Sequence, residues 1–142
     1  MRPCYLLLIL CVLLASCGKD PNTYVPHVSG YWEIQEVTLA SGEKKVYQYN
    51  ETIDFIAIDT SMKGFRKKLK PGFNNTYNAS KDAEAVEARI ENDSLNLYYK
   101  TPYAEWKETV LNADEENLTI INQNKDLYIY KRYQSITIDL EE

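Results

Sequence analysis

Cysteine and histidine are scarce in this sequence. All three cysteines lie within the first 17 residues, and the chain has a single histidine, His27. Because no cysteine follows Cys17, no disulfide can form beyond that point, and the fold there must be stable through packing alone. Metal sites built from histidine and cysteine, and nucleophilic sites with a histidine base, lack the residues they need. We therefore predict no catalytic residues, no metal site and no cofactor, and we expect a protein that is not an enzyme.

Positive charge is also in short supply. The chain has 16 lysines and arginines against 21 aspartates and glutamates, a net charge of -5. This balance disfavours nucleic acid and anionic membrane surfaces as partners, and we predict no nucleic-acid partner. The acids include Glu105 and Glu108, which we interpret as a solvated strand face rather than a catalytic pair. The basic run from Lys63 to Lys70 is interpreted as an edge hairpin protected by lysines, with a patch for an anionic partner as the alternative.

Long hydrophobic runs are absent except near the start of the chain. Tyr5 to Ala15 is an apolar run of 11 residues, which spans only about 16 Å as a helix. A membrane-spanning helix needs about 20 residues. With the positive charge of Arg2 before the run, residues 1–16 are predicted to form an export signal peptide rather than a membrane span.

The end of this run carries a second signal. Leu14-Ala15-Ser16-Cys17 resembles the bacterial lipobox, which implies cleavage before Cys17 and acylation of that cysteine. The resemblance implies an anchor in the lipid bilayer, and we expect a lipoprotein of the outer membrane of a Gram-negative bacterium, on either its periplasmic or its cell-surface face. Residues 17–29 hold two prolines and one glycine and are predicted to be the lipidated cysteine followed by a flexible tether.

From Gly30 onward, apolar residues alternate with a period of two. Strands are expected at 31–39, at 45–49 and 52–58 together as a second strand, and at 63–69, 76–80, 86–90, 94–99, 105–111, 117–121 and 126–130; those at 63–69 and 76–80 are weaker candidates. Short polar turns separate them, and no stretch is suited to a helical crossover. Residues 30–142 are therefore predicted to be one all-β domain, an antiparallel meander of about eight to nine strands closed into a barrel. A two-sheet β-sandwich is the alternative.

Two short motifs at the ends of this domain are similar to the lipocalin pattern. Gly30-Tyr31-Trp32 opens the first strand, and Arg132 closes the last strong one. In lipocalins, such an arginine packs over the tryptophan and seals one end of the barrel. The resemblance implies that Gly30, Trp32 and Arg132 close a lipocalin-like barrel here. The chain is shorter than a typical lipocalin and lacks the helix that usually follows the barrel.

The resemblance also indicates which side chains face the interior. If Arg132 points inward, alternation places Tyr128 and Tyr130 inside as well, together with Ile34 on the first strand. Such an interior suits a small apolar or amphipathic ligand, so we predict Ile34, Trp106, Tyr128 and Tyr130 as ligand-binding residues. The alternative is a filled barrel that acts as an accessory protein, binding a protein or an anionic glycan of the cell envelope through its outer face.

One turn carries a candidate modification site. Asp93-Ser94-Leu95 resembles the Asp-Ser/Thr-aliphatic sequence that some Gram-negative lineages O-glycosylate outside the cytoplasm. The motif falls in a predicted turn, where a glycan has room. Ser94 is therefore the candidate O-glycosylation site.

Overall fold

The computed structural model describes residues 18–135, which form ten strands and two short helical elements. The strands are β1 (Gly30–Thr38), β2 (Lys44–Val46), β3 (Ile53–Ile58), β4 (Lys63–Pro71), β5 (Tyr77–Ala79), β6 (Glu84–Glu91), β7 (Ser94–Lys100), β8 (Glu105–Ala113), β9 (Asn117–Asn122) and β10 (Leu127–Arg132). The predicted all-β class is confirmed. The number of strands is slightly higher than predicted, because the segments 45–49 and 52–58, predicted to form one strand together, hold two separate strands, β2 and β3.

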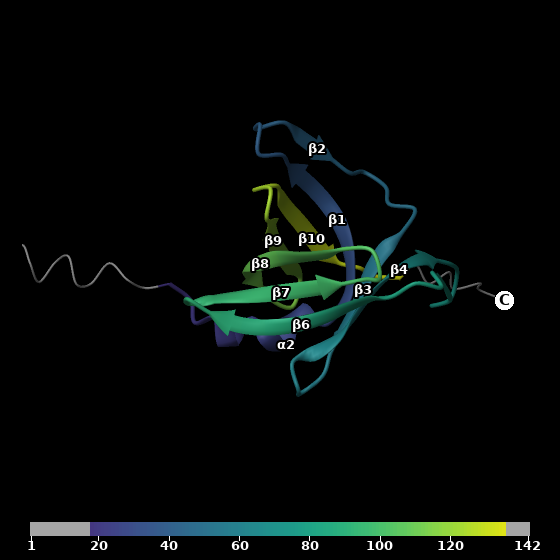
Figure 1. The fold of residues 1–142 in the computed structure, drawn as a ribbon. Coiled ribbons are helices and arrows are strands. Elements are labelled where there is room, and N and C mark those ends of the chain that lie inside the picture. Colours follow the sequence, from purple (N-terminus) through teal and green to yellow (C-terminus); the bar gives the residue numbers. More distant parts are fainter. Residues whose placement is uncertain (1–17, 136–142) are drawn as a thin grey trace, which may run out of the picture.

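Eight of the strands close into an antiparallel barrel in the order β1-β3-β4-β6-β7-β8-β9-β10. Closure is made by β10, which pairs with β1 so that Trp32 lies opposite Arg132. β2 and β5 are additions that pair with β1 and β4. Because the first and last barrel strands are hydrogen-bonded to each other, the structure is a barrel and not the alternative sandwich. Figure 1 shows the strands curving around a common interior.

The turn between β6 and β7 shows how local sequence sets the strand register. Asn92 and Asp93 have positive φ angles of 50° and 57°, which these two residue types tolerate well. They form a two-residue hairpin that pairs Glu91 with Ser94. Ser94 is therefore the first residue of β7, half-buried and directly after the predicted turn.

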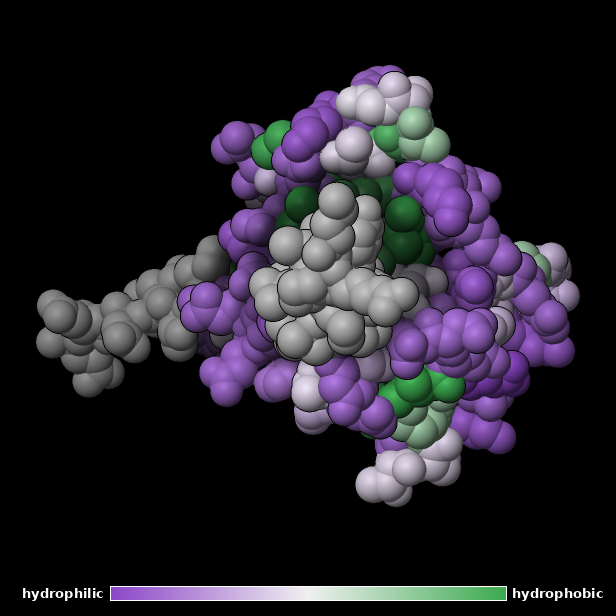
Figure 2. Space-filling view, turned by 90° about the vertical axis from the view of Figure 1, so that its left-hand side faces the viewer, coloured by the Kyte–Doolittle hydropathy of each residue, from purple (hydrophilic) through white to green (hydrophobic). Residues whose placement is uncertain are grey.

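The closed half of the barrel interior holds the main hydrophobic core. Alternate residues of neighbouring strands point inward and are almost fully buried: Trp32, Ile56, Val86, Ala88, Leu95, Leu97, Val110, Leu118 and Ile120. The opposite faces of β6 and β7 are mostly polar, as expected for a sheet with one buried side. Figure 2 shows hydrophilic residues over most of one face of the molecule, with hydrophobic residues in separate patches.

The segment before the barrel is folded rather than extended. It forms η1 (Pro21–Thr23) and α2 (Val25–Val28), and α2 lies beneath β6 and β7 in Figure 1. Tyr24 and Val28 are buried in the barrel core, and the Val28 carbonyl accepts a hydrogen bond of 2.8 Å from the indole nitrogen of Trp32. These contacts plug the closed end of the barrel.

The prediction of a flexible tether over 17–29 is therefore wrong for residues 21–28. Their two prolines suggested a linker, but Tyr24 and Val28 belong to the hydrophobic core and Val25 packs against it. Cys17 and the predicted signal peptide lie outside the described residues. Within residues 18–135, no helix has the length and hydrophobicity needed to cross a membrane.

Candidate functional site

The closed end of the barrel is sealed by Arg132. Its guanidinium carbon lies 3.7 Å from the centroid of the Trp32 ring, and Gly30 lies so close that a side chain there would collide with the guanidinium. The guanidinium also donates to four backbone carbonyls, those of Ser29, Glu115, His27 and Asp114, at 2.8, 2.9, 3.1 and 3.4 Å. Burial lowers the pKa of Arg132, and the charge of Asp114 opposes this change. All three guanidinium nitrogens donate to the protein itself, so this geometry is suited to closure and not to holding a ligand.

The middle of the barrel is filled by side chains. Above Trp32, the interior leaves a cavity of only about 10 Å³, roughly the space of one water molecule. Its walls are mostly apolar, from Ile56, Leu97, Leu118 and Ile120. A ligand of ordinary size therefore has no room at this depth, and a site has to lie closer to the open end.

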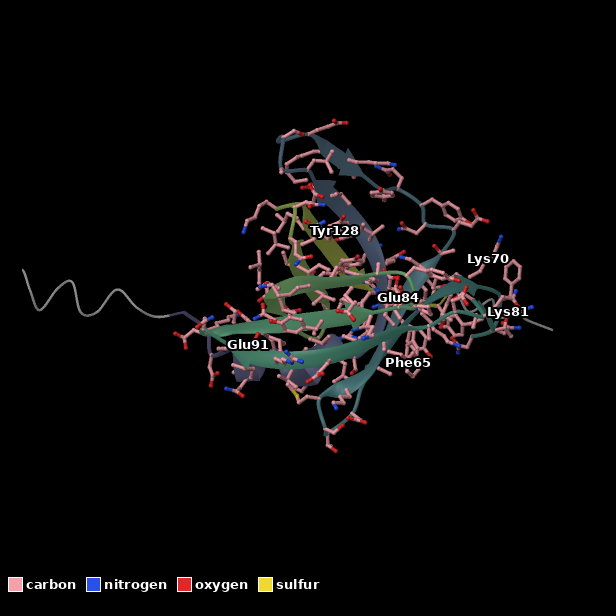
Figure 3. All side chains as sticks on the ribbon, viewed as in Figure 1. Phe65, Lys70, Lys81, Glu84, Glu91 and Tyr128 are labelled. Carbon is pink, nitrogen blue, oxygen red and sulfur yellow. The ribbon has the colours of Figure 1, made fainter. Side chains whose placement is uncertain are left out.

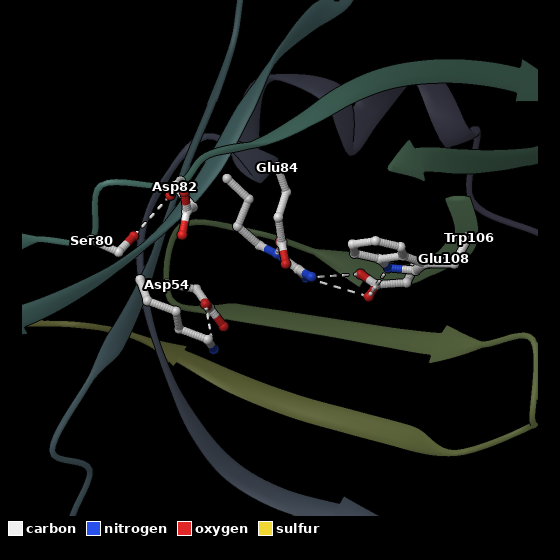
Figure 4. A network of polar contacts seen from close by, with 8 residues as sticks. Asp54, Ser80, Asp82, Glu84, Trp106 and Glu108 are labelled. Atoms are coloured by element: carbon white, nitrogen blue, oxygen red, sulfur yellow. Dashed lines mark hydrogen bonds and ion pairs between the residues drawn. The ribbon is translucent and has the colours of Figure 1, made fainter. Parts of the chain in front are cut away.

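A charged cluster lies above this filled region, inside the barrel (Figure 4). Arg66 on β4 pairs with Glu84 on β6 at 2.6 Å and with Glu108 on β8 at 3.3 Å. Its guanidinium also stacks over the ring of Tyr99 on β7, 4.2 Å from the centroid. Four strands thus hold one arginine in place, and only 12% of its side chain is exposed.

Burial and charge together set the ionisation of this cluster. Burial raises the pKa of Glu108, while Arg66 and a hydrogen bond from the Trp106 indole partly offset that rise. Burial alone would lower the pKa of Arg66, but its negatively charged neighbours outweigh it and raise the pKa above the ordinary value. The interpretation of Glu108 as part of a solvated face is wrong, because its side chain points inward and pairs with Arg66 across the barrel.

The described residues hold no group of three or more acids, histidines or cysteines arranged to bind a metal ion. Arg66 separates Glu84 from Glu108, so these two carboxylates are paired with a cation and not with each other. Tyr99, next to them, is 2% exposed, and burial strongly raises the pKa of its phenol. The arrangement is that of a buried ion-pair network.

The open end of the barrel contains a cleft of about 370 Å³. Three of the predicted ligand residues line it, namely Ile34, Tyr128 and Tyr130, with Trp32 beneath them. Tyr130 is 7% exposed, whereas Tyr128 and Ile34 are half-buried and accessible from the cleft. Trp106, the fourth predicted residue, does not line this cleft. It stacks on Tyr99 at 5.2 Å between centroids and belongs to the charged cluster.

The segment between β2 and β3 completes the cleft, and sequence reasoning missed it. Tyr47, Tyr49, Asn50 and Thr52 line the cleft from this connection. The Asn50 amide donates to the Ile34 carbonyl at 2.8 Å and so fixes the connection against β1. The concentration of tyrosines in a short connection was the available signal, but only the closed barrel shows that they face Tyr128.

An ion pair lies at one side of the cleft and was also missed. The Lys68 ammonium lies 2.6 Å from a carboxylate oxygen of Asp54, and the two side chains differ greatly in exposure, at 61% and 5%. Three of the five cations in the basic run from Lys63 to Lys70 are paired with carboxylates. Arg66 pairs with Glu84 and Glu108, Lys68 pairs with Asp54, and Lys70 pairs with Glu51 at 2.6 Å at the end of β4 (Figure 3). These three cations are therefore not free to form a basic patch.

The outer face carries a row of aromatic rings instead. Phe65, Phe55, Tyr31, Tyr77 and Tyr133 follow one another with centroid separations of 5.9, 4.7, 5.1 and 6.4 Å. Phe65 is 36% exposed, and the other four are half-buried. This outer aromatic row crosses β4, β3, β1 and β5.

Comparison with known proteins shows a similar fold among solved structures. No family model matches the sequence, and no curated protein is detectably similar to it. Among solved structures, the chain is similar to a lipocalin-like protein from Bacteroides uniformis, with a TM-score of 0.50 and 7% sequence identity. The match covers 75% of this chain and 99% of that one. At this identity the likeness concerns the fold alone, and the chain has the fold of a lipocalin-like β-barrel.

Proposed function

We propose that this protein binds a small amphipathic molecule in the cleft at the open end of its barrel. The observation that carries the proposal is the composition of the cleft, in which aromatic side chains and one ion pair meet in about 370 Å³. Ligand sites typically combine apolar walls with a few polar groups in a volume of this order. Small lipocalin-like barrels place ligands at or below their open end, which agrees with the position of the cleft.

The filled interior refines this proposal. A purely apolar ligand would be held in a deep hydrophobic chamber, but the described barrel has space for about one water at that depth. The charged cluster around Arg66 lies directly above the apolar core and leaves the core inaccessible from the cleft. An amphipathic ligand is therefore favoured over a fully apolar one.

We further propose that this binding takes place in the cell envelope, without catalysis. The support for the location is the lipobox resemblance at Cys17, which implies export and a lipid anchor. A Cys17→Ser variant that remained in the membrane fraction would contradict the anchor. When cells are supplied with a labelled fatty acid, we expect the wild type to incorporate the label and the Cys17→Ser variant to remain unlabelled.

Native mass spectrometry of the protein purified from its host tests the binding. We expect a retained small molecule in the wild type and its loss in Tyr128→Ala, because Tyr128 is half-buried and lines the cleft. Tyr103→Ala is the matched control, since Tyr103 is 96% exposed and outside the cleft. A wild-type protein without any bound molecule, and equal spectra for both variants, would contradict the proposal.

A second candidate function is the binding of a partner protein by the outer face. The outer aromatic row from Phe65 to Tyr133 favours it, because aromatic residues are enriched where proteins meet. An anionic glycan has less support, since Arg66, Lys68 and Lys70 of the basic run are already paired with carboxylates. A partner cross-linked in the host and lost in Phe65→Ser, but kept in the control Phe73→Ser, is the result that would favour this function.

A further inference from the structure

The cleft also identifies the class of ligand, an inference that rests on the proposed function. We infer that the polar end of the ligand is an organic cation, an ammonium group that pairs with Asp54 in place of Lys68. The inference is built on the unequal burial of this ion pair, on the aromatic walls around it and on the balance of charge inside the barrel.

Asp54 and Lys68 differ in how firmly they are held. Asp54 is 4% exposed, so its carboxylate cannot turn away from the cleft, and a buried carboxylate requires a cation beside it. The Lys68 side chain is 61% exposed and reaches Asp54 from the rim on a flexible stem. Arg66 contrasts with it, because two carboxylates and an aromatic ring hold its guanidinium. Lys68 is therefore the exchangeable cation of the interior, and Arg66 is a fixed one.

The walls of the cleft favour a cation as well. Tyr47, Tyr128, Tyr130 and Trp32 surround the space next to Asp54. Aromatic faces attract ammonium groups, and one such contact is already made by Lys45, whose ammonium lies 4.8 Å from the centre of the Tyr47 ring. The ammonium groups of Lys68 and Lys45 thus show two positions at this end of the barrel where an ammonium group is stabilised, one beside Asp54 and one over the Tyr47 ring.

The balance of charge decides between a cation and an anion. In these ion pairs the three carboxylates of Asp54, Glu84 and Glu108 face the two cations Arg66 and Lys68, so this group of side chains has one negative charge in excess. A ligand ammonium that replaces Lys68 at Asp54 leaves this balance unchanged. An anion would instead have to draw Lys68 away and leave Asp54 buried without a partner, which is strongly unfavourable.

Three probes with the same alkyl chain test the inference. Octylammonium, octyl sulfate and octyl glucoside are titrated calorimetrically into the protein purified from its host, below their micelle concentrations. We expect octylammonium to bind about tenfold more tightly than octyl glucoside, because only its ammonium group can form a charge-assisted hydrogen bond to Asp54. Octyl sulfate should bind most weakly. Asp54→Asn should abolish the preference for octylammonium over octyl glucoside.

Lys68→Ala provides an independent test that does not alter a buried residue. It removes the competing ammonium, so octylammonium should bind several-fold more tightly than to the wild type. Lys100→Ala is the matched control, because Lys100 is a similarly exposed lysine that pairs with Glu105 at 2.6 Å, and neither of these two residues lines the cleft. Its effect on octylammonium binding should be negligible. If Asp54→Asn fails to fold, the comparison of these two lysine variants alone tests whether the ligand cation takes the place of Lys68.

Several outcomes would overturn the inference. These are equal affinity for all three probes, weaker binding of octylammonium to a folded Lys68→Ala variant, or a preference for octyl sulfate that Lys68→Ala removes. If none of the probes binds while the host-purified protein still carries a small molecule, the cation inference fails and the proposed function stands. If the host-purified protein also carries none, the proposed function fails with it.

Discussion

Arg132 lies over Trp32, with its guanidinium carbon 3.7 Å from the centre of the indole, although the two residues come from the last and first strands of the barrel. The same guanidinium bonds to carbonyls in the segment before β1 and in the β8–β9 turn. One side chain therefore ties together the strand closure, the helical plug and the neighbouring turn. Four predictions about stability follow from contacts of this kind, and each can be measured separately from ligand binding.

Arg132→Lys should destabilise the fold although it keeps the charge. A lysine ammonium cannot reach the four carbonyls that the planar guanidinium spans, so hydrogen bonds of charged donors are lost. We expect a decrease of about 2 kcal/mol in the free energy of unfolding, measured with urea. Lys131→Ala is the control, since Lys131 is half-exposed and pairs with Glu33 at the surface. Equal stability of Arg132→Lys and the wild type would contradict the role of the guanidinium geometry.

Arg66→Met should have a larger effect, because it leaves the buried Glu108 without its cation. Loss of one member of a buried pair costs about 3–5 kcal/mol. The double variant Arg66→Met/Glu108→Leu should be more stable than Arg66→Met, since it removes the unpaired carboxylate. Arg89→Met serves as the control, because Arg89 is 47% exposed and pairs with Glu87 at the surface. If the double variant is no more stable than Arg66→Met, the burial of Glu108 is not the cause.

Val28→Ala should destabilise the protein if residues 21–28 are part of the folded domain. Val28 is 1% exposed and contacts the core, so we expect a loss of about 1–3 kcal/mol in the free energy of unfolding. Val46→Ala is the matched control, because Val46 is 62% exposed. If residues 21–28 were a tether, the two variants would have equal free energies of unfolding, and that result would support the linker interpretation.

Asp114→Asn should change how stability depends on pH. Hydrogen bonds from Asn112 and from the backbone of Glu116 and Asn117 lower the pKa of Asp114 from 3.8 to about 2. The ionised carboxylate therefore stabilises the folded state above pH 3.8, and this contribution is lost as the pH falls toward about 2. The variant should be less stable than the wild type at pH 7, and the difference should shrink at pH 2. Asp93→Asn, in the exposed turn before β7, is the control variant.

The sequence by itself determined the fold class and the strand positions. Alternating apolar residues and short turns such as Asn92-Asp93 are local signals, since a side-chain period of two fixes which residues share a face. The inward orientation of Trp32, Ile34, Tyr128 and Tyr130 followed from the same alternation and from the resemblance at Gly30 and Arg132. The cleft residues on β1 and β10 were predictable for this reason.

Only the tertiary structure decided what lies around those residues. The pairing of Asp54 with Lys68, and of Arg66 with Glu108, depends on which strands become neighbours across a closed barrel, and a strand's own sequence carries no record of that. The plug formed by Tyr24 and Val28 likewise depends on the core residues that it packs against, and strands distant in sequence bring these residues together only when the barrel closes. Apolar side chains fill the barrel near its closed end, and the charged cluster around Arg66 lies between them and the open end. Because these distant side chains meet in the interior, the candidate site lies at the open end.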